Sequence, residues 1–253
     1  MYGLIGKSLI HSWSPQYFNQ KFRELNITGI EYHLFPLSDV NDLPALIEKY
    51  PKLAGLNVTI PYKTQVQSFL DFQSPEALAT GSVNVIRILR NTQHVSMKGY
   101  NTDVFGFGGS IIPHMQSYHK AALILGTGGA AHAAGYVFGS LGIDYIFVSR
   151  NPQDANQVAY EELNRMHFER CSIIVNATPL GMFPDSTGFP PISYQFITPQ
   201  HLLFDMIYNP VETRFMQKGK SQGATVINGL QMLHLQADKA WDIFTSEEFD
   251  GLG

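Results

Sequence analysis

The segment that most constrains the fold begins at Lys120 and reads "KAALILGTGGAAHAAGYVFGSLGIDYIFVSRN". An apolar strand, a glycine-rich turn, an alanine-rich helix and a second apolar strand follow one another there, which is the order of a βαβ unit. Gly126, Gly128 and Ala131 stand at the spacing of a dinucleotide-binding turn. The first glycine permits a tight turn, the second lets a pyrophosphate approach the backbone, and the small alanine lets helix and strand pack closely. The segment predicts a dinucleotide-binding unit, with a purely structural glycine turn as the alternative.

The residues at the end of the second strand predict which dinucleotide binds. An acidic side chain about 20 residues after the glycines would bind the ribose 2′-hydroxyl of NAD. The chain has Ser149, Arg150 and Asn151 at this point instead. A guanidinium forms charge-assisted, bidentate contacts with a phosphate. Arg150 therefore favours NADP, whose ribose carries a 2′-phosphate, and an ordinary surface arginine is the alternative.

Length and composition limit the class of protein. The chain has 253 residues, of which 44% are hydrophobic and 15% charged, enough for one large domain or two modest ones. Its net charge of −4 argues against a nucleic-acid partner, because a phosphate backbone is bound by basic surfaces. Cys171 is the only cysteine, and no apolar run approaches the roughly 20 residues that cross a bilayer. We expect a cytoplasmic protein with no membrane partner.

Short apolar segments alternate with helical segments, which predicts two α/β lobes with mostly parallel sheets. In the N-terminal part the expected strands cover residues 2–6, 31–37, 54–60 and 82–89, and the expected helices cover 14–26 and 42–50, with another beginning near Thr102 or Asp103. Beyond the βαβ unit we expect strands over 171–179, 201–208 and 223–229. Pro210 is expected to begin a helix, and residues 230–244 have the spacing of an amphipathic helix.

The stretch "HSWSP" after the first expected strand predicts the start of a helix, with Ser14 as its N-cap and Pro15 at its first position. A helix N-terminus also attracts anions. Ser12 has no capping role in this arrangement, so we expect its hydroxyl to serve a ligand. His11 is expected to be structural or peripheral.

Two further polar segments carry groups suited to the reduction of a ketone. "NVTIPYK" contains Lys63, and "GYNTDVFG" contains Asp103. Hydride transfer to a ketone leaves an alkoxide that needs a proton, which a lysine can supply and an aspartate can help to orient. Taken alone, each of these charges is more typical of a solvated surface. Neither segment has the spacing of metal ligands, so no metal site is expected.

Seven motifs follow one another over nearly the whole chain: "HSWSP", "NVTIPYK", "GSVNVI", "GYNTDVFGF", "LGTGGAAHA", "NATPLGM" and "GLQMLHLQ". In this order they resemble the shikimate dehydrogenase family. The resemblance implies NADPH-dependent reduction of 3-dehydroshikimate to shikimate, a step of chorismate and aromatic amino-acid biosynthesis. It also implies a substrate-binding catalytic lobe over residues 1–103, a Rossmann-type NADP-binding lobe over 104–227, and a C-terminal helix over 228–253 that returns to the substrate lobe.

The resemblance also assigns a role to each site residue. Lys63 is the acid/base, and Asp103 orients the lysine and the substrate. The other substrate-binding residues are Ser12 and Ser14 at the carboxylate, Thr59 and Asn84 (with Asp103) at the ring hydroxyls, and Tyr208 and Gln236. The cofactor-binding residues are Gly126, Thr127, Gly128, Gly129 and Ala130 at the pyrophosphate, Ser149, Arg150 and Asn151 at the adenosine phosphate, and Thr178, Met206 and Gly229 on the nicotinamide side.

Some positions depart from the family pattern. Ser149, Asn151 and Asp154 stand where the family often has Asn, Thr and a second cation, which narrows the preference for NADP over NAD. Phe18 replaces a histidine and Val85 a threonine, with little effect expected on the chemistry.

Two alternatives to this function stay open. One is a quinate/shikimate dehydrogenase of broader substrate and NAD or NADP use, although serines at positions 12 and 14 favour shikimate. The other is a non-catalytic NADP-binding sensor, against which the presence of Lys63 and Asp103 argues. A folate-linked dehydrogenase, which also pairs a lysine with a Rossmann lobe, is disfavoured by "HSWSP" and "NTD". A homodimer is also left open.

Overall fold

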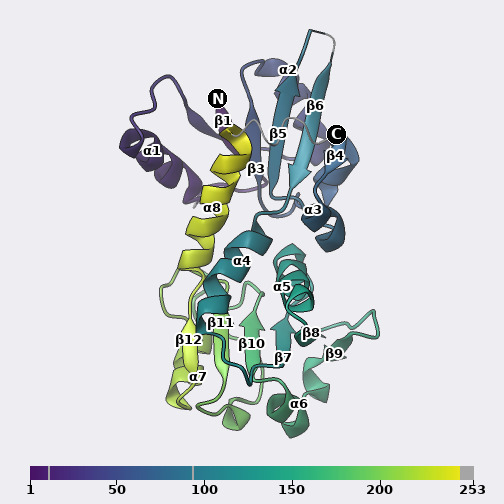
Figure 1. Cartoon of the computed structure of the whole chain (residues 1–253), viewed down its shortest axis with the longest axis vertical. Helices are drawn as coiled ribbons and strands as arrows, with labels where there is room; N and C mark the ends of the chain where they lie inside the picture. Colours follow the sequence, from purple (N-terminus) through teal and green to yellow (C-terminus); the bar gives the residue numbers. More distant parts are fainter. Residues whose placement is uncertain (11, 93, 246–253) are drawn as a thin grey trace. The chain divides into compact units, whose positions relative to one another are not determined.

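The computed structural model describes residues 1–10, 12–92 and 94–245. The chain divides into two compact units, both visible in Figure 1. The first unit contains Met1–Thr102 together with the chain from Ala237, and the second contains Asp103–Gln236. The return to the first unit thus falls at Ala237, inside the last helix, whereas the family resemblance implied a return at residue 228.

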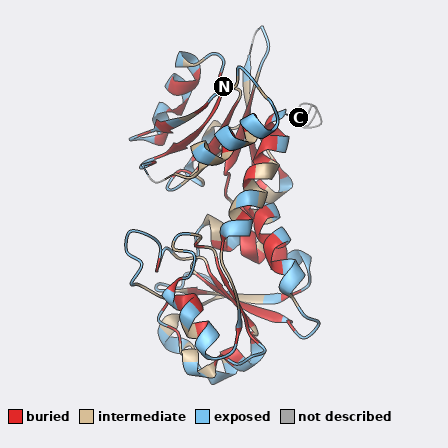
Figure 2. Ribbon diagram, turned by 90° about the vertical axis from the view of Figure 1, so that its left-hand side faces the viewer, coloured by how far each residue is buried: buried red, intermediate tan, exposed pale blue. Residues whose placement is uncertain are grey.

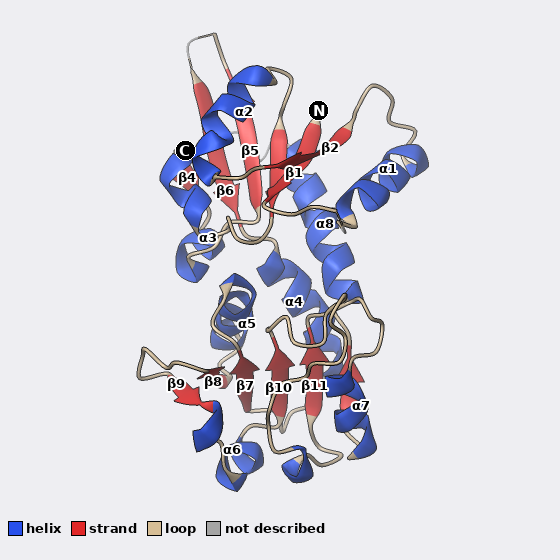
Figure 3. Ribbon diagram, turned by 180° about the vertical axis from the view of Figure 1, so that it is seen from behind, coloured by secondary structure: helices blue, strands red, loops and turns tan. Residues whose placement is uncertain are grey.

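The first unit is built on a mixed sheet with the strand order β2-β1-β3-β5-β6-β4 (Figure 3). Its described strands are β1 (Tyr2–Gly6), β2 (Tyr32–Pro36), β3 (Gly55–Val58), β4 (Phe72–Gln73), β5 (Val85–Arg90) and β6 (Val95–Tyr100). β1 is parallel to β2 and β3, and β4 is parallel to β6, but β5 is antiparallel to both of its neighbours. Sequence analysis did not predict the β5–β6 hairpin, because β6 reads "VSMKGY" and lacks an apolar run.

Aromatic side chains fill one core of this unit, between the sheet and two helices. The described helices of the unit are α1 (Ser14–Glu24), α2 (Leu43–Lys49), α3 (Pro75–Thr80) and the last turns of α8 (Leu230–Thr245). Phe18 and Phe22 lie four residues apart on α1 and are both buried. The Phe18 ring stacks on Tyr32 with centroids 4.4 Å apart, and Tyr2 stacks on Phe244 at 4.8 Å. These aromatic contacts make α8 part of the core of the first unit.

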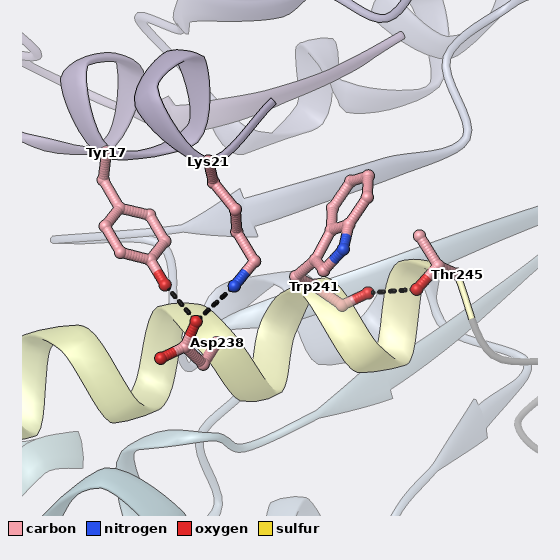
Figure 4. Close-up of polar contacts among 5 residues, drawn as sticks. All are labelled: Tyr17, Lys21, Asp238, Trp241 and Thr245. Atoms are coloured by element: carbon pink, nitrogen blue, oxygen red, sulfur yellow. Dashed lines mark hydrogen bonds and ion pairs between the residues drawn. The ribbon is translucent and has the colours of Figure 1, made fainter. Parts of the chain in front are cut away.

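A polar contact joins the same two helices. Figure 4 shows the Asp238 carboxylate of α8 beneath Tyr17 and Lys21 of α1. One carboxylate oxygen accepts hydrogen bonds from both the Tyr17 hydroxyl and the Lys21 ammonium. Because Tyr17 and Lys21 lie one turn apart, a single side chain fixes two points of α1.

The second unit is a parallel sheet with the strand order β12-β11-β10-β7-β8-β9. Its described strands are β7 (Ala121–Leu125), β8 (Asp144–Ser149), β9 (Gln157–Ala159), β10 (Ile173–Asn176), β11 (Leu202–Asp205) and β12 (Thr225–Ile227), and its described helices are α4 (Asp103–Ile111), α5 (Gly129–Ser140), α6 (Arg165–Arg170), α7 (Arg214–Ser221) and the start of α8. In chain order this is the 3-2-1-4-5-6 arrangement of the Rossmann fold, with the reversal of strand order between β7 and β10. The expected two-unit α/β architecture is therefore confirmed.

Local expectations for the second unit were less accurate. The helix expected to begin at Pro210 begins at Arg214 instead, because Thr213 caps it by accepting a hydrogen bond from the Met216 N–H. The stretch after β8 contains β9 and α6, which were not predicted from the sequence. The central strands β7, β10 and β11 are buried along their lengths, as the red ribbons of Figure 2 show.

A substitution at Gly55 of β3 can test the packing of α8 on the first sheet. A Cβ atom at this position would lie 2.5 Å from Cε1 of Phe244 and 3.2 Å from Cδ1 of Tyr2, both in buried rings. Gly55→Ala should therefore lower the free energy of unfolding by about 1–3 kcal/mol, measured by urea denaturation. The matched control is Gly108→Ala on α4, where a Cβ would meet nothing closer than 3.7 Å. The control should be neutral or stabilising, because alanine favours a helix over glycine. A Gly55→Ala protein as stable as the parent would contradict this packing.

Candidate active site

Strand ends gather at one edge of the first sheet. Because β5 is antiparallel to β3 and β6, its first residue lies beside the last residues of both, and Val85 pairs with Asn57 and with Tyr100. The Val58 N–H donates to the Asn84 carbonyl at 2.8 Å, and the Asn84 N–H donates to the Tyr100 carbonyl at 3.0 Å. The loops that follow β3 and β6 and the residue that precedes β5 are therefore neighbours.

Thr59 and Lys63 belong to the loop that follows β3, and both are half-buried. The Thr59 N–H donates to the Ile5 carbonyl at 2.9 Å, and the Lys63 carbonyl accepts from the Val83 N–H at 2.8 Å. A Cβ atom on Gly6 would lie 2.6 Å from Cγ2 of Thr59, so the glycine at the end of β1 makes room for this loop. The loop is thus held at both ends.

Asn84 holds the segment that leads to Asp103. Its buried amide donates to the Thr102 hydroxyl at 3.0 Å and accepts from the Thr102 backbone N–H at 2.7 Å. Asp103, the next residue, is buried and begins α4, as expected from the sequence. The contact between Asn84 and Thr102 therefore fixes the chain immediately before the predicted catalytic aspartate.

The two serines of "HSWSP" differ from expectation. The N-cap of α1 is Trp13, whose dihedral angles (φ −78°, ψ −22°) are close to helical, so the helix begins at Ser14. The Ser12 Oγ accepts a hydrogen bond from the Ser14 backbone N–H at 3.3 Å. The prediction that Ser14 is the N-cap is wrong, because the helix begins one residue earlier than the Ser-Pro pattern indicates, and Ser12 is not the N-cap either.

The Ser14 side chain instead belongs to a polar chain that reaches the sheet. It forms a hydrogen bond with the Tyr32 hydroxyl, which donates to the Asn57 Oδ1 at 2.8 Å. Burial raises the pKa of the Tyr32 phenol, so the hydroxyl stays protonated. Asn57 and Tyr32 are both buried, and their contact joins β2 to β3.

The glycine turn of the second unit has the geometry of a phosphate cradle. Gly126 follows β7 with φ +108°, a conformation that favours glycine, and a Cβ there would lie 3.2 Å from the Ala177 carbonyl oxygen. Gly128 is the N-cap of α5, where no side chain caps the helix, and a Cβ added to it would meet no atom within 4 Å. Thr127 and Gly128 are exposed, and Gly129 and Ala130 are half-buried. The free N–H groups of the helix and the open space above them fit a pyrophosphate.

The segment after β8 offers one cation to a second phosphate. Arg150 is exposed and forms no ion pair with any described residue, while the Ser149 Oγ accepts from the Asn151 N–H at 3.1 Å. Asp154 accepts a hydrogen bond from Gln157 at 2.8 Å. The guanidinium is therefore available for a 2′-phosphate, and these residues fit NADP.

The predicted nicotinamide-side residues follow β10 and β11 and precede α8. Thr178 follows β10, and its Cγ2 would lie 3.3 Å from a Cβ on Gly126, which places it against the glycine turn. The Met206 N–H donates to the Asn176 carbonyl at 3.0 Å. Gly229 is buried, and a Cβ there would lie 2.6 Å from the Met206 carbonyl carbon. The fold thus brings Thr178, Met206 and Gly229 to one edge of the second sheet.

Two predicted substrate residues also belong to the second unit. Tyr208, after β11, is half-buried, and burial raises the pKa of its phenol. Gln236 lies on α8 beside Gly106 of α4, where a Cβ on the glycine would lie 3.0 Å from the glutamine Cβ. Its amide donates to the Leu233 carbonyl at 3.1 Å.

A buried polar pair, missed by sequence analysis, lies at the same strand ends. Asn176 ends β10, Asp205 ends β11, and the two are paired in the sheet. The Asn176 amide donates to the Asp205 Oδ1 at 3.0 Å. The signal was present in "IIVN" and "LLFD", where a polar residue closes each apolar run. Tyr32 and Asn57 were likewise given no role.

The remaining predictions concern a metal site, a membrane-spanning helix and His11. Among the residues that the structure describes, no three His, Cys, Asp or Glu side chains are grouped to hold a metal ion. Within the same residues, no helix is long and apolar enough to cross a membrane. His11, predicted to be peripheral, lies outside the described residues.

The parallel sheet with its glycine turn at the switch point, together with a second α/β unit, defines a Rossmann-type dinucleotide-binding protein. Residues 4–86 match the family model described as the shikimate dehydrogenase substrate binding domain. The chain is also 40% identical over 264 residues to shikimate dehydrogenase (NADP(+)) of Clostridium beijerinckii, with 98% of this chain and 93% of the relative covered. The chain therefore belongs to the shikimate dehydrogenase family, as its motifs predicted.

Solved structures agree with this assignment. Shikimate dehydrogenase 1 from Peptoclostridium difficile matches with a TM-score of 0.79 at 38% identity, over 96% of this chain and 90% of the other. Quinate dehydrogenase from Corynebacterium glutamicum, in complex with NAD, matches with a TM-score of 0.85 at 26% identity, over 98% of this chain and 94% of the other. Both shikimate and quinate dehydrogenases therefore share this fold.

The raised pKa of the Asp205 carboxyl leads to a prediction for how the free energy of unfolding depends on pH. Burial raises its pKa from 3.8 to about 6, although bonds from Thr213, Ile207 and Asn176 oppose the rise. Between these two pH values the folded state holds a proton that the unfolded state releases. Protonation of Asp205 therefore contributes fully to the free energy of unfolding below pH 3.8. This contribution is lost as the pH rises through 6.

Relative to Asp205→Asn, which cannot titrate, the parent should lose about 2.5 kcal/mol of unfolding free energy between pH 4 and pH 8. Urea denaturation of both proteins at the two pH values measures this difference. The other titratable groups are the same in both proteins, so their contributions to the pH dependence cancel in the comparison. A difference that is the same at both pH values would contradict the raised pKa.

Proposed function

We propose that the protein reduces 3-dehydroshikimate to shikimate with NADPH. The observation that carries the proposal is the polar edge of the first sheet, where the loop that holds Thr59 and Lys63 lies beside Asn84, in a chain of the shikimate dehydrogenase family. A hydroxyl, an ammonium and an amide suit a small acid that carries ring hydroxyls and a ketone. Membership of the family of the Clostridium beijerinckii enzyme supports the same reaction.

The substrate-binding groups differ in their chemistry. In our proposal the Ser12 and Ser14 hydroxyls donate to the substrate carboxylate, while Thr59, Asn84 and Asp103 bind the ring hydroxyls. Tyr208 and Gln236 complete the set of hydrogen-bonding partners. Since the Ser12 Oγ already accepts from the Ser14 N–H, its hydroxyl proton stays free to donate to an anion. The hydrogen bond that Ser12 accepts from Ser14 and a binding role for its hydroxyl are therefore compatible.

Lys63 is the proposed proton donor. NADPH, when bound, supplies a hydride to the ring carbonyl carbon. The carbonyl oxygen then takes a proton from the Lys63 ammonium, and the neutral amine regains a proton from water. Asp103 keeps the lysine and the neighbouring substrate hydroxyl in position, and its own place is set by the contact between Asn84 and Thr102. In the reverse direction Lys63 acts as the base.

The second unit holds the cofactor in this proposal. Gly126 to Ala130 cradle the pyrophosphate, and the Arg150 guanidinium, flanked by Ser149 and Asn151, binds the 2′-phosphate. Thr178, Met206 and Gly229 line the nicotinamide side. Cys171 is buried and burial raises the pKa of its thiol to about 11, which accords with a reducing, cytoplasmic setting.

A second candidate is a quinate/shikimate dehydrogenase that uses both cofactors. It is favoured by Arg150 standing as a single cation beside the acidic Asp154, because two cations would discriminate a 2′-phosphate more strongly than one. The shared fold with a quinate dehydrogenase bound to NAD points the same way.

Purified protein should reduce NADP when given shikimate, followed by nicotinamide absorbance. Parallel assays with quinate, each with NADP and NAD, separate the two candidate functions.

Lys63→Ala should lower kcat by about 10²- to 10⁴-fold, the usual contribution of a general acid, with a much smaller change in the KM for shikimate. Lys52→Ala, at an exposed lysine of the same unit, serves as the control. An inactive parent would refute the enzyme, and an unchanged kcat would remove Lys63 from the mechanism.

Arg150→Ala should raise the KM for NADP by about 10- to 100-fold, because it removes charge-assisted hydrogen bonds to the 2′-phosphate. The KM for NAD, which lacks this phosphate, should change far less. Steady-state kinetics with both cofactors measure the ratio. Arg165→Ala is the matched control, since Arg165 is an exposed arginine of the same unit that pairs with Glu169. Equal shifts for NADP and NAD would contradict the proposed contact.

A further inference from the structure

Asp205 is a buried carboxylate that the proposed reaction does not use. It closes β11, has no exposed surface, and forms no ion pair with a described lysine or arginine. Burying a charge without a counter-ion is costly, so such a group calls for an explanation beyond stability. At neutral pH it is ionised, because its pKa is raised only to about 6.

Three donors from different segments point at this carboxylate. The Asn176 amide and the Ile207 N–H donate to Oδ1 at 3.0 and 3.1 Å, and the Thr213 hydroxyl donates to Oδ2 at 2.5 Å. These donors come from the end of β10, the loop after β11, and the cap of α7. Asp205 is therefore a point where three segments meet.

An ionised carboxylate can only accept hydrogen bonds, and this property sets the orientation of its neighbour. The Asn176 side chain must turn its NH₂ toward Asp205, which turns its Oδ1 toward the loop after β10. That Oδ1 accepts from the Thr178 backbone N–H at 3.1 Å and from the Thr178 hydroxyl at 2.7 Å. The Thr178 backbone N–H can only donate, so the carboxylate and this N–H hold the amide in one orientation from its two ends.

The same carboxylate sets the loop after β11. Its bond from the Ile207 N–H fixes the residue that follows Met206, and the Ile207 carbonyl accepts from the Gly229 N–H at 3.0 Å. All three residues assigned to the nicotinamide side are therefore connected to Asp205. Thr178 is reached through Asn176, and Met206 and Gly229 through Ile207.

We propose that Asp205 is a positioning residue for the nicotinamide-binding edge of the second unit, acting through Asn176 on Thr178 and through Ile207 on Met206 and Gly229. The inference rests on the assignment of those three residues to the nicotinamide side in the proposed function. It extends that function by naming the group that holds them, which itself touches neither cofactor nor substrate.

The test uses the full chain with NADP⁺ as the probe, in saturation-transfer difference NMR. The spectrum reports contacts of the nicotinamide ring and of the adenine ring separately, so the adenine signal is an internal control. In Asp205→Ala the nicotinamide signal should be lost relative to adenine. Asp205→Asn, which keeps one accepting oxygen, should restore part of it. The kcat for shikimate oxidation should follow the same order, falling about 10- to 100-fold in Asp205→Ala, as expected when a reacting group is misplaced by about 1 Å.

Asp185 provides the matched control. Its carboxylate also accepts from a threonine hydroxyl, that of Thr187 at 2.8 Å, but in an exposed loop of the same unit. Asp185→Ala should leave both ring signals and kcat unchanged. Circular dichroism checks that each variant is folded.

The outcomes separate this inference from the proposed function. Nicotinamide and adenine signals that fall together, or a folded Asp205→Ala protein that behaves like the parent, would overturn the positioning role. Failure of both Asp205 variants to fold would assign the residue to the core instead. A parent that shows no nicotinamide signal would also overturn it. A parent with a strong nicotinamide signal but no turnover of shikimate would refute the proposed function alone, and the ring signals would still decide the role of Asp205.

Discussion

Buried asparagine side chains at the ends of strands hold the loops on which the chemistry depends. In the first unit the Asn84 amide binds both the backbone N–H and the hydroxyl of Thr102. In the second unit the Asn176 amide binds the same two groups of Thr178. A backbone N–H group that is buried just beyond the end of a strand needs a hydrogen-bond acceptor. The side-chain amide of an asparagine supplies one without extending the strand. Each unit thus uses an Asn–Thr contact to turn the chain away from its sheet.

The two contacts differ in what orients the amide, and the difference affects both stability and function. The Asn84 NH₂ group meets a hydroxyl, and its Oδ1 is held by the Thr102 backbone N–H, which can only donate. Asn176 meets the Asp205 carboxylate, which can only accept. The second arrangement costs more, because it leaves a charge buried without a counter-ion. The carboxylate also holds the Asn176 amide from its NH₂ side, which suits a loop that we propose to line the nicotinamide. Burial of the Asp205 charge lowers the stability of the fold, and in return the carboxylate fixes the position of the Asn176 side chain.

The parts of the fold that sequence analysis predicted correctly are those with a local cause. The βαβ unit, the glycine turn and the start of α4 at Asp103 follow from periodicity and from residues close together in the chain. The strand β6 was missed because Lys98 is buried by its tertiary setting, which its neighbours in "VSMKGY" do not reveal. Ser14 was wrongly predicted as the N-cap because the helix begins one residue early, and such boundaries depend on tertiary packing. The site residues themselves came from the family resemblance. The polar residue that closes "LLFD" was a local signal, but the partners of Asp205 could not be predicted, because Asn176 and Thr213 are brought to it only by the sheet and by α7.

The last helix has a consequence for how the chain is made. The second unit is continuous in sequence, but the aromatic core of the first unit includes Trp241 and Phe244, near the end of the chain. On the ribosome the first unit is synthesised first and yet lacks part of its core until the final helix has emerged. The usual order, in which the N-terminal domain folds first, is therefore reversed, and the Rossmann-type unit can close while the other waits. During that interval Tyr2, Phe18 and Phe22 lack the aromatic contacts that α8 provides in the folded protein, so their apolar surface stays exposed until the last helix is made.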